Sequence, residues 1–265
     1  VRTIKDKCRI CYTCVRECPA KAIKISDGQA EVVNERCIGC GNCVQVCSQN
    51  AKVVLDSIDS VGNILNKKVK KAAIIAPSFP AEFSDIDHKK LIGAIRKMGF
   101  DFVNEVGFGA DLVAREMRKL FTETDDKFIS TACPAIFGYV KKYRPELVQY
   151  LAPIVSPMVA TARALRELYN KNMEIVFIGP CIAKKGEAYT DEIEGEINEV
   201  LTFKELRKLF EKQDFNWRNC EGSDFDPPFG NKGNIFPIKR GMLETAELPE
   251  NLMSRDIVSA NGREN

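Results

Sequence analysis

The sequence predicts a small α+β domain followed by a larger α/β domain, and two observations support this prediction. Eight of the 11 cysteines lie before residue 50, in two runs of equal spacing. From residue 72 onward, short apolar runs of strand length alternate with segments of helical periodicity, which indicates a largely parallel sheet covered by helices. We place the two domains at residues 1–56 and 72–265, joined by a linker at 57–71.

The cysteine runs define the first domain. The first run is followed by Pro19 and the second by Ser48. Their spacing, C-x2-C-x2-C-x3-C, is typical of bacterial ferredoxins with two 4Fe-4S clusters. The runs comprise Cys8, Cys11, Cys14 and Cys18, then Cys37, Cys40, Cys43 and Cys47. We therefore expect residues 1–56 to form a ferredoxin-like two-cluster domain.

In this pattern the fourth cysteine of each run binds the other cluster. The expected ligands of one cluster are Cys8, Cys11, Cys14 and Cys47. Those of the second are Cys37, Cys40, Cys43 and Cys18. Because so small a unit buries little apolar surface, we expect it to unfold without iron.

Zinc sites and a disulfide framework fit the eight cysteines less well. Zinc sites use pairs of ligands rather than runs of three plus one, and residues 1–56 contain no histidine. A disulfide framework suits a secreted chain, and no signal peptide precedes the runs. Thiolates that stay reduced suggest a cytoplasmic protein.

Overall composition argues against several classes of partner. The chain has 39 lysines and arginines and 37 aspartates and glutamates, a net charge of +2. This balance favours neither nucleic acid nor an acidic partner. No apolar run is long enough to span a membrane. We expect neither a nucleic-acid nor a membrane partner.

The elements follow in order along the chain. In the first domain, strands are expected at 22–25 and 52–55, one after each cysteine run. The stretch 57–71 is amphipathic and ends in basic residues, which suggests a solvated connector. In the second domain we expect strands at 73–76, 100–106, 127–130, 174–178 and near 200, and helices at 87–98, 111–121, 157–169 and 203–211.

Two later cysteines follow predicted strands. Cys133 precedes a proline suited to the first turn of a helix, and Cys181 follows the strand at 174–178. The carboxyl ends of parallel strands meet at one edge of a sheet, where sites form. Helix N-termini favour thiolate, and Lys184 and Lys185 would strengthen that field. Isolated cysteines can also be small buried apolar residues, so this alternative stays open.

The surrounding motifs resemble those of the iron-only (FeFe) hydrogenases. Thr131-Ala132-Cys133-Pro134 and Pro180-Cys181-Ile182-Ala183-Lys184-Lys185-Gly186-Glu187 resemble the first two signature motifs of that family. Stretches 108–112, 201–206 and 224–230 are also similar. The resemblance covers nearly the whole chain, including the cluster domain before the catalytic one. It implies a fold class of α+β ferredoxin-like two-cluster domain followed by an incomplete α/β hydrogenase-like domain.

The resemblance also implies a cofactor. The family's H-cluster is a 4Fe-4S cubane joined through a cysteine to a two-iron unit that carries CO, cyanide and a bridging dithiolate. Cys133 and Cys181 match two of its four cubane cysteines. Lys184 matches the lysine that hydrogen-bonds a cyanide ligand, and Glu187 matches the glutamate that closes the second motif.

The chain departs from the family in its proton relay. A cysteine precedes the first ligand in catalytic members, and this chain has Ala132 there. The relay glutamates align with Met117 and Leu120, and the relay serine aligns with Ala152. None of these side chains can pass a proton, so fast hydrogen turnover by the usual route is expected to be lost.

The set of cysteine ligands for the H-cluster is also incomplete. The family's third motif supplies the last two cubane cysteines, but after Cys181 the sequence contains only Cys220, without C-x3-C spacing. Either the chain is cut before that motif, or this member of the family has lost it. We favour truncation, and we expect Cys220 to be an ordinary thiol. Sequencing the reading frame beyond Asn265 would reveal or exclude a Glu-x3-Cys-x3-Cys motif.

Three functions remain. The first is a hydrogenase-like redox protein that passes electrons through two clusters to or from an H-cluster, for hydrogen oxidation, proton reduction or hydrogen sensing. Its partner would be a redox protein such as ferredoxin or a fused signalling domain. The second is a ferredoxin-type electron-transfer protein without a two-iron unit. The third is an iron-sulfur assembly protein without hydrogenase activity.

In the complete protein, Ala132→Cys is expected to raise hydrogen turnover, because it restores a thiol that can pass protons. Hydrogen evolution from a chemical reductant measures the change. An unchanged rate would mean that the relay argument is wrong, or that Met117, Leu120 and Ala152 also block the path.

Overall fold

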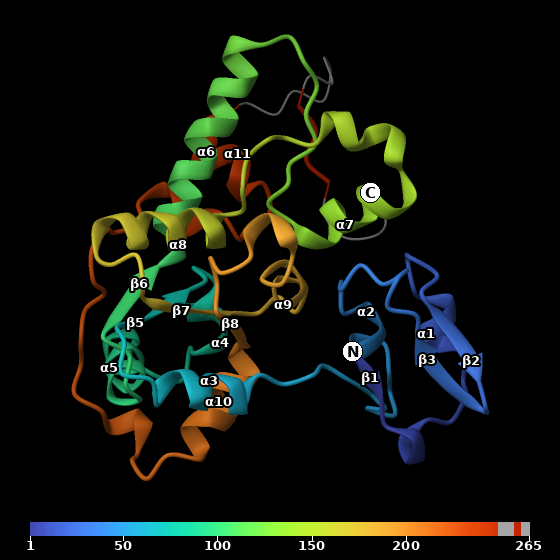
Figure 1. The fold of residues 1–265 in the computed structure, drawn as a ribbon, viewed down its shortest axis with the longest axis horizontal. Helices are drawn as coiled ribbons and strands as arrows, with labels where there is room; N and C mark the ends of the chain where they lie inside the picture. Colours follow the sequence, from blue (N-terminus) through green and yellow to red (C-terminus); the bar gives the residue numbers. More distant parts are fainter. Residues whose placement is uncertain (249–256, 261–265) are drawn as a thin grey trace.

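The two cysteine runs fold as a structural repeat. The computed structural model describes residues 1–248 and 257–260 (Figure 1). Strands β2 and β3 form an antiparallel hairpin, and β1 pairs antiparallel with β4, which joins the two ends of the repeat. The elements are β1 Arg2–Thr3, η1 Lys5–Lys7, α1 Thr13–Arg16, β2 Ile23–Ser26, β3 Gln29–Val32, α2 Asn42–Gln45 and β4 Lys52–Val53.

The cysteine loops share an unusual backbone conformation. Ile10 and Gly39 occupy equivalent places and both have positive φ, at 53° and 70°. Tyr12 and Gly41 form the next equivalent pair, at 60° and 79°. A β-branched residue such as Ile10 rarely adopts this conformation, because its side chain clashes with the backbone. The spacing of the thiols therefore imposes the same loop shape on both runs, whichever residue lies there.

The second domain is built on a four-stranded parallel sheet in the order β6-β5-β7-β8. Figure 1 shows α8 on one side of this sheet and α3 and α10 on the other. The strands are β5 Lys71–Ile75, β6 Phe102–Glu105, β7 Glu174–Gly179 and β8 Glu199–Thr202. The helices are α3 Ile58–Leu65, α4 Phe79–Glu82, α5 His88–Lys97, α6 Val106–Glu123, α7 Pro134–Tyr143, η2 Pro145–Tyr150, α8 Pro157–Leu168, α9 Ala183–Glu187, η3 Asp191–Ile193, α10 Phe203–Glu211, η4 Trp217–Asn219, η5 Lys232–Ile235 and α11 Gly241–Ala246.

The strand order places a crevice beside β7. The chain moves from β5 to β6 on one side and returns to the other side of β5 with β7. At such a reversal the connecting loops diverge, and they leave a crevice at the carboxyl ends of the two strands. Because β7 ends at Gly179, the segment Pro180-Cys181 begins at this crevice.

Most of the expected elements of the second domain are present, with two differences. The strand expected at 127–130 is wrong, because only an isolated bridge joins Ile129 to Leu151. Helix α6 begins at Val106 rather than near residue 111. Its first turn contains Gly109, where a Cβ atom would lie 2.2 Å from Pro157 O. The glycine permits close packing against α8, although its low helix propensity hides this turn in the sequence.

The predicted linker at 57–71 is instead part of the second domain. It contains α3, whose Ile58, Val61 and Ile64 are buried in the core of the α/β domain. The amphipathic pattern reflects this burial, since apolar residues three apart lie on one face of a helix. The two hydrophobic cores therefore separate between β4 and Ser57.

No helix in the described parts of the chain, 1–248 and 257–260, is long and apolar enough to cross a membrane.

A buried ion pair ties α3 to the loop after β7. Lys185 Nζ donates to Glu205 Oε1 at 2.9 Å and to Ser57 Oγ at 2.6 Å. Glu205 also accepts from Ser57 N, and its carboxylate completes the capping box of α10 with Thr202. Both charged side chains are largely shielded from solvent. This network connects the entry of the second domain to α9.

Glu205→Ala is expected to lower the free energy of unfolding by about 3–5 kcal/mol, because it leaves the Lys185 ammonium buried without its counter-charge. Chemical denaturation followed by circular dichroism measures the loss. Glu211→Ala, at an exposed position of the same helix, should change it by about 0.5 kcal/mol or less. Equal effects of the two variants would contradict a structural role for the pair.

Candidate metal centres and the cavity between the domains

The structure brings the first expected ligand set together. Cys8, Cys11, Cys14 and Cys47 line one pocket of the N-terminal domain. Three of them come from the first run, and the fourth comes from the far end of the second run. This is the crossed arrangement expected from the spacing, and it arises because β1 and β4 pair the two ends of the repeat.

The structure also brings the second set together. Cys18, Cys37 and Cys43 lie in or against the apolar core of the N-terminal domain, which also contains Cys8 and Cys14 of the first set. Burial raises the pKa of Cys40, and the neighbouring Cys18 and Cys37 raise it further. Cys18, from the first run, is thus close to the thiols of the second.

The protein environment affects these thiols unequally. Burial raises the pKa of Cys43 to about 11 and raises that of Cys14, whereas a hydrogen bond with Thr13 lowers the pKa of Cys11. Iron must displace the protons of buried thiols, so assembly of a metal centre is favoured as pH rises toward these raised values.

Backbone N–H groups face the fourth cysteine of each run. Ala22 N donates to Cys18 Sγ at 3.2 Å, and Ala51 N donates to Cys47 Sγ at 3.3 Å. Such bonds stabilise negative charge on sulfur and help to set cluster potentials. Within residues 1–248 and 257–260, no group of three or more His, Cys, Asp or Glu is placed to hold a single metal ion. A cubane spreads its thiolates over separate corners, so this donor set fits 4Fe-4S clusters.

The loops of Cys133 and Cys181 meet in the second domain. Cys133 is the N-cap of α7 and is exposed, whereas Cys181 follows β7 and is partly buried. Helix α7 packs against α9, and Lys184 Nζ lies 3.5 Å from Ala132 O. The first two motifs are therefore in contact.

The two adjacent lysines of α9 have different environments. Lys184 Nζ donates to Glu187 Oε2 at 2.6 Å; Lys184 is buried and Glu187 is partly buried. Lys185 is directed toward Glu205 and Ser57, as described above. The expectation that Lys185 would strengthen a positive field at Cys181 is therefore wrong, because its charge is paired with Glu205.

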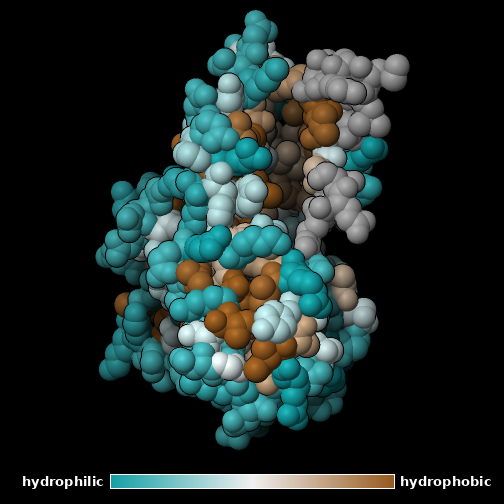
Figure 2. Space-filling model, turned by 90° about the vertical axis from the view of Figure 1, so that its right-hand side faces the viewer, coloured by the Kyte–Doolittle hydropathy of each residue, from teal (hydrophilic) through white to brown (hydrophobic). Residues whose placement is uncertain are grey.

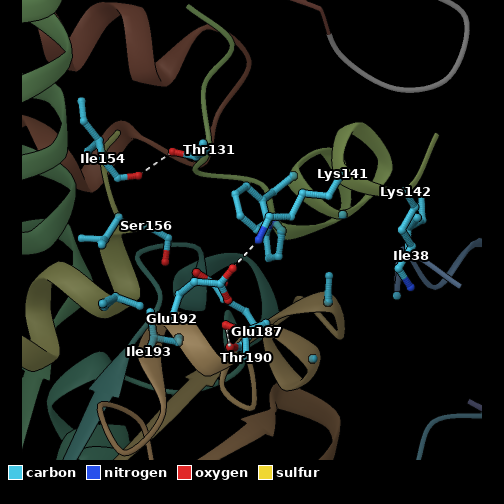
Figure 3. A pocket seen from close by; sticks show the side chains of 18 of the residues that line it. Ile38, Thr131, Lys141, Lys142, Ile154, Ser156, Glu187, Thr190, Glu192 and Ile193 are labelled. Carbon is cyan, nitrogen blue, oxygen red and sulfur yellow. Dashed lines mark hydrogen bonds and ion pairs between the residues drawn. The ribbon is translucent and has the colours of Figure 1, made fainter. Parts of the chain in front are cut away.

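A cavity of about 570 Å³ lies beside these loops (Figure 3). Its walls are mostly apolar, and they include Ala152, which is buried. Neither Cys133 nor Cys181 is among the lining residues, but their neighbours Thr131, Pro134 and Ala183 are. Figure 3 also shows an ion pair between Lys141 and Glu192.

Ser156 is the unexpected polar group of this cavity. It lines the wall, and its buried Oγ has no hydrogen-bond partner in the structure. Burying an unpaired hydroxyl is unfavourable, so this atom is available to a bound group. The sequence carried only a weak signal for it, since a serine before Pro157 has the pattern of an ordinary helix cap.

The N-terminal domain closes one side of the cavity. Cys37, Ile38 and Gly39 line it from the second cysteine loop. A Cβ atom on Gly39 would lie 3.4 Å from Ala183 Cα, and one on Gly41 would lie 2.7 Å from Ile182 Cδ1. Glycine at these positions lets the second cluster loop pack directly against the loop that follows Cys181.

Helix α7 links the same loop to Cys133. Lys142 Nζ donates to Cys37 O at 2.8 Å. The Tyr143 hydroxyl lies 2.7 Å from Ala20 O and 2.8 Å from Arg36 O, and its ring packs against the core around Cys18. Because α7 begins immediately after Cys133, one short helix spans the distance between the two candidate centres.

Cys220 does not belong to this site. It is buried in the core of the second domain, and its Sγ lies 3.8 Å from Asn216 O. It does not line the cavity, which agrees with the expectation of an ordinary thiol.

Comparison with known proteins accounts for this arrangement. Residues 69–263 match the family described as the iron-only hydrogenase large subunit, C-terminal domain. The chain belongs to the iron-only hydrogenase family. Residues 1–48 match the 4Fe-4S dicluster domain, so the protein is a hydrogenase-like iron-sulfur protein.

Three curated proteins illustrate its range of relatives. Iron hydrogenase 1 of Clostridium pasteurianum is 28% identical over 233 residues, which cover 76% of this chain and 41% of that protein. The NADP-reducing hydrogenase subunit HndD of Solidesulfovibrio fructosivorans is 23% identical over 291 residues, which cover 91% of this chain and 49% of that protein. The cytosolic Fe-S cluster assembly factor NAR1 of Meyerozyma guilliermondii is 24% identical over 215 residues, which cover 69% of this chain and 40% of that protein. The chain spans about half the length of these relatives.

Solved structures share the fold. The apo FeFe-hydrogenase HydA1 from Chlamydomonas reinhardtii superimposes with a TM-score of 0.59 at 23% identity, over 72% of this chain and 58% of that chain. This likeness supports the α/β hydrogenase fold of the second domain.

The second domain fits an H-cluster in part. The apolar cavity, the free Ser156 Oγ and the buried Lys184 suit a group with polar ligands. Cys133 and Cys181 are two of the four thiolates that a cubane needs. Cys220, the other cysteine of the second domain, is buried elsewhere in the core, so two of the four thiolates are accounted for at this site.

Removal of iron is expected to unfold residues 1–53 while the parallel sheet remains folded, because the thiol pockets lie at the centre of the small domain. Hydrogen exchange measured by mass spectrometry, before and after anaerobic chelation, tests this. Amides of β5 and β7 are the internal control and should keep their protection. Full protection of β2 and β3 after complete iron loss would refute the prediction.

Proposed function

We propose that this protein passes electrons through two 4Fe-4S clusters to or from an H-cluster-type site at Cys133 and Cys181. The crossed thiol sets, Cys8, Cys11, Cys14 and Cys47, and Cys37, Cys40, Cys43 and Cys18, would bind the two clusters. The cavity walled by both the Cys37 loop and the α9 loop supports this function most directly. With these walls, a candidate electron donor would lie beside a candidate hydrogen site.

Helix α7 supports transfer between the two centres. Its first residue follows Cys133, and its last two residues, Lys142 and Tyr143, donate to the carbonyls of Cys37 and Arg36 at the second cluster loop. Electron transfer slows steeply with separation, so a rigid helix that fixes this separation suits the role. The Lys142 and Tyr143 contacts would hold the cluster domain in place.

The inner wall suits a two-iron unit. Such a unit would supply the chemistry of hydrogen binding. Lys184 would present its ammonium to an anionic ligand, with Glu187 holding the side chain in place. Ser156, whose buried hydroxyl lines the cavity, would donate a hydrogen bond to the same unit. The surrounding apolar side chains would exclude water.

The residues of the cavity favour hydrogen sensing over rapid turnover. Ala152 lines it in place of the relay serine, and Ala132 contacts Lys184 only through its carbonyl. Met117 and Leu120 lie on α6 and do not line the cavity. With no relay group at these positions, proton delivery would be slow, while hydrogen could still alter the oxidation state of the clusters.

Partners and location follow from this proposal. The first cysteine loop exposes Cys11 and Tyr12, and Figure 2 shows apolar side chains gathered on the outer face of the N-terminal domain. A redox protein such as ferredoxin, or a fused signalling domain, would exchange electrons there. Oxygen-sensitive clusters favour the cytoplasm, although one relative is named a periplasmic hydrogenase.

Iron-sulfur assembly is the second candidate. Relatives named cytosolic Fe-S cluster assembly factors align with more than half of the chain, and the loss of relay groups suits a protein that does not turn over hydrogen. Such a protein would bind cubanes without a two-iron unit. The buried Lys184 favours the first function, since a cubane alone has no cyanide ligand for it.

Infrared spectroscopy separates the two functions. After anaerobic maturation, the full-length protein should show CO and cyanide bands. Lys184→Met should reduce retention of the two-iron unit by about tenfold or more, because it removes a charge-assisted hydrogen bond. Lys204→Met, at an exposed site on α10, is the matched control and should have no effect.

Absence of these bands in the matured parent protein, together with intact 4Fe-4S clusters, would rule out the hydrogenase-type function and support electron transfer or assembly. Bands unchanged by Lys184→Met would show that this lysine does not hold the two-iron unit.

A further inference from the structure

Lys52 is a buried lysine with neutral polar neighbours. Only 3% of its surface is exposed. It lies in β4 opposite Thr3, and its Nζ donates to Thr3 Oγ1 and to Ala30 O, both at 2.6 Å. In the described part of the chain no ion pair joins Lys52 to a carboxylate, whereas Lys24 of the same domain pairs with Glu31.

A buried ammonium without a counter-charge is strongly unfavourable. The charges that could compensate it are the two thiol sets. Lys52 lines the same pocket as Cys8, Cys11, Cys14 and Cys47. Its acceptor Ala30 packs in the apolar core of the domain, which contains Cys8 and Cys14 of the first set and Cys18, Cys37 and Cys43 of the second. The lysine is therefore bonded to the core that both candidate centres share.

Electrostatics agrees with this position. The Lys52 ammonium is close enough to Cys14 of the first set and to Cys43 of the second for its positive charge to act on both thiols. One ammonium thus acts on thiols of both sets.

We propose that Lys52 is the shared counter-ion of the two 4Fe-4S clusters and raises the reduction potential of both. The inference rests on the proposed function, because it requires the clusters to be present. A cluster with four thiolates is negatively charged and becomes one unit more negative when it accepts one electron, without taking up a proton. A fixed cation nearby stabilises the reduced form more than the oxidised form.

Lys52 would raise the reduction potentials of both clusters together. Because a single charge serves both centres, its removal should shift both midpoints in the same direction. The shift should be larger for the first centre, whose pocket Lys52 lines directly. A purely structural role, in which the amine only bonds Thr3 and Ala30, predicts no such pattern.

The test is an anaerobic redox titration of the cluster-loaded protein with dithionite, followed by electron paramagnetic resonance. Lys52→Met should move both midpoints to more negative values, by about tenfold in the equilibrium constant for the nearer centre, which corresponds to 59 mV for a one-electron couple. Lys52→Arg should restore most of the parent potentials. Lys24→Met, on the exposed hairpin, should leave both unchanged.

Lys52→Gln separates charge from hydrogen bonding, because its amide can still donate to Ala30 O. Potentials like those of Lys52→Met support the proposal, and potentials like those of the parent overturn it. If both neutral variants lose iron while Lys52→Arg keeps it, a counter-ion role is also supported. Loss of iron in all three variants overturns it.

The parent protein provides the separate check on the proposed function. If the reconstituted parent does not show two 4Fe-4S signals, the proposed function itself is refuted. If the parent shows both signals and Lys52→Met leaves both midpoint potentials unchanged, only the counter-ion role of Lys52 is refuted.

Discussion

The N-terminal domain depends on bringing eight thiols together around two metal centres. Its apolar core is small, and several of its thiols are buried with raised pKa values. Iron relieves this cost, since thiolates bound to a cluster share their charge with the metal. Both cysteine loops share positive φ values at equivalent positions, including the β-branched Ile10, which agrees with one loop shape set by the common spacing of the thiols.

The position of the second cluster loop links this domain to the sheet. Strand order places the segment after β7 at a crevice, and the glycines of the second run allow close contact with it. The first run has Ile10 and Tyr12 at the equivalent positions, and none of its residues lines the cavity. The two halves of the repeat therefore differ, since only the second run has the glycines that permit this contact.

Both domains contain buried lysines, but the partners differ. Those of the second domain pair with glutamates, whereas Lys52 of the first donates to neutral oxygen atoms. Lys184 is paired with Glu187 beside the cavity, and Lys185 is paired with Glu205 in the core. Lys52 donates to neutral oxygen atoms of Thr3 and Ala30, lines the pocket of the first thiol set and is bonded to the core that both sets share. Because a buried cation requires compensation, the absence of a carboxylate bonded to Lys52 in the described part of the chain points to the charge of the clusters themselves.

Local spacing and periodicity were enough to predict the cluster domain and the α/β class, whereas the interpretation of Cys133 and Cys181 as ligands came from the family resemblance. C-x2-C spacing sets loop length, and a strand that ends before Cys181 places that thiol at the edge of the sheet. Helix α3 was mistaken for a linker because an amphipathic pattern does not show which surface its apolar face will meet.

The roles of Lys52, Lys142, Ser156 and the adjacent lysines of α9 became visible only in the folded chain. Their partners lie far away in the sequence: Lys52 reaches Ala30, Lys142 reaches Cys37, and Lys185 reaches Glu205. Burial and charge compensation depend on which segments meet after folding. Such contacts leave no periodic signal in the chain, so no pattern among neighbouring residues could assign them.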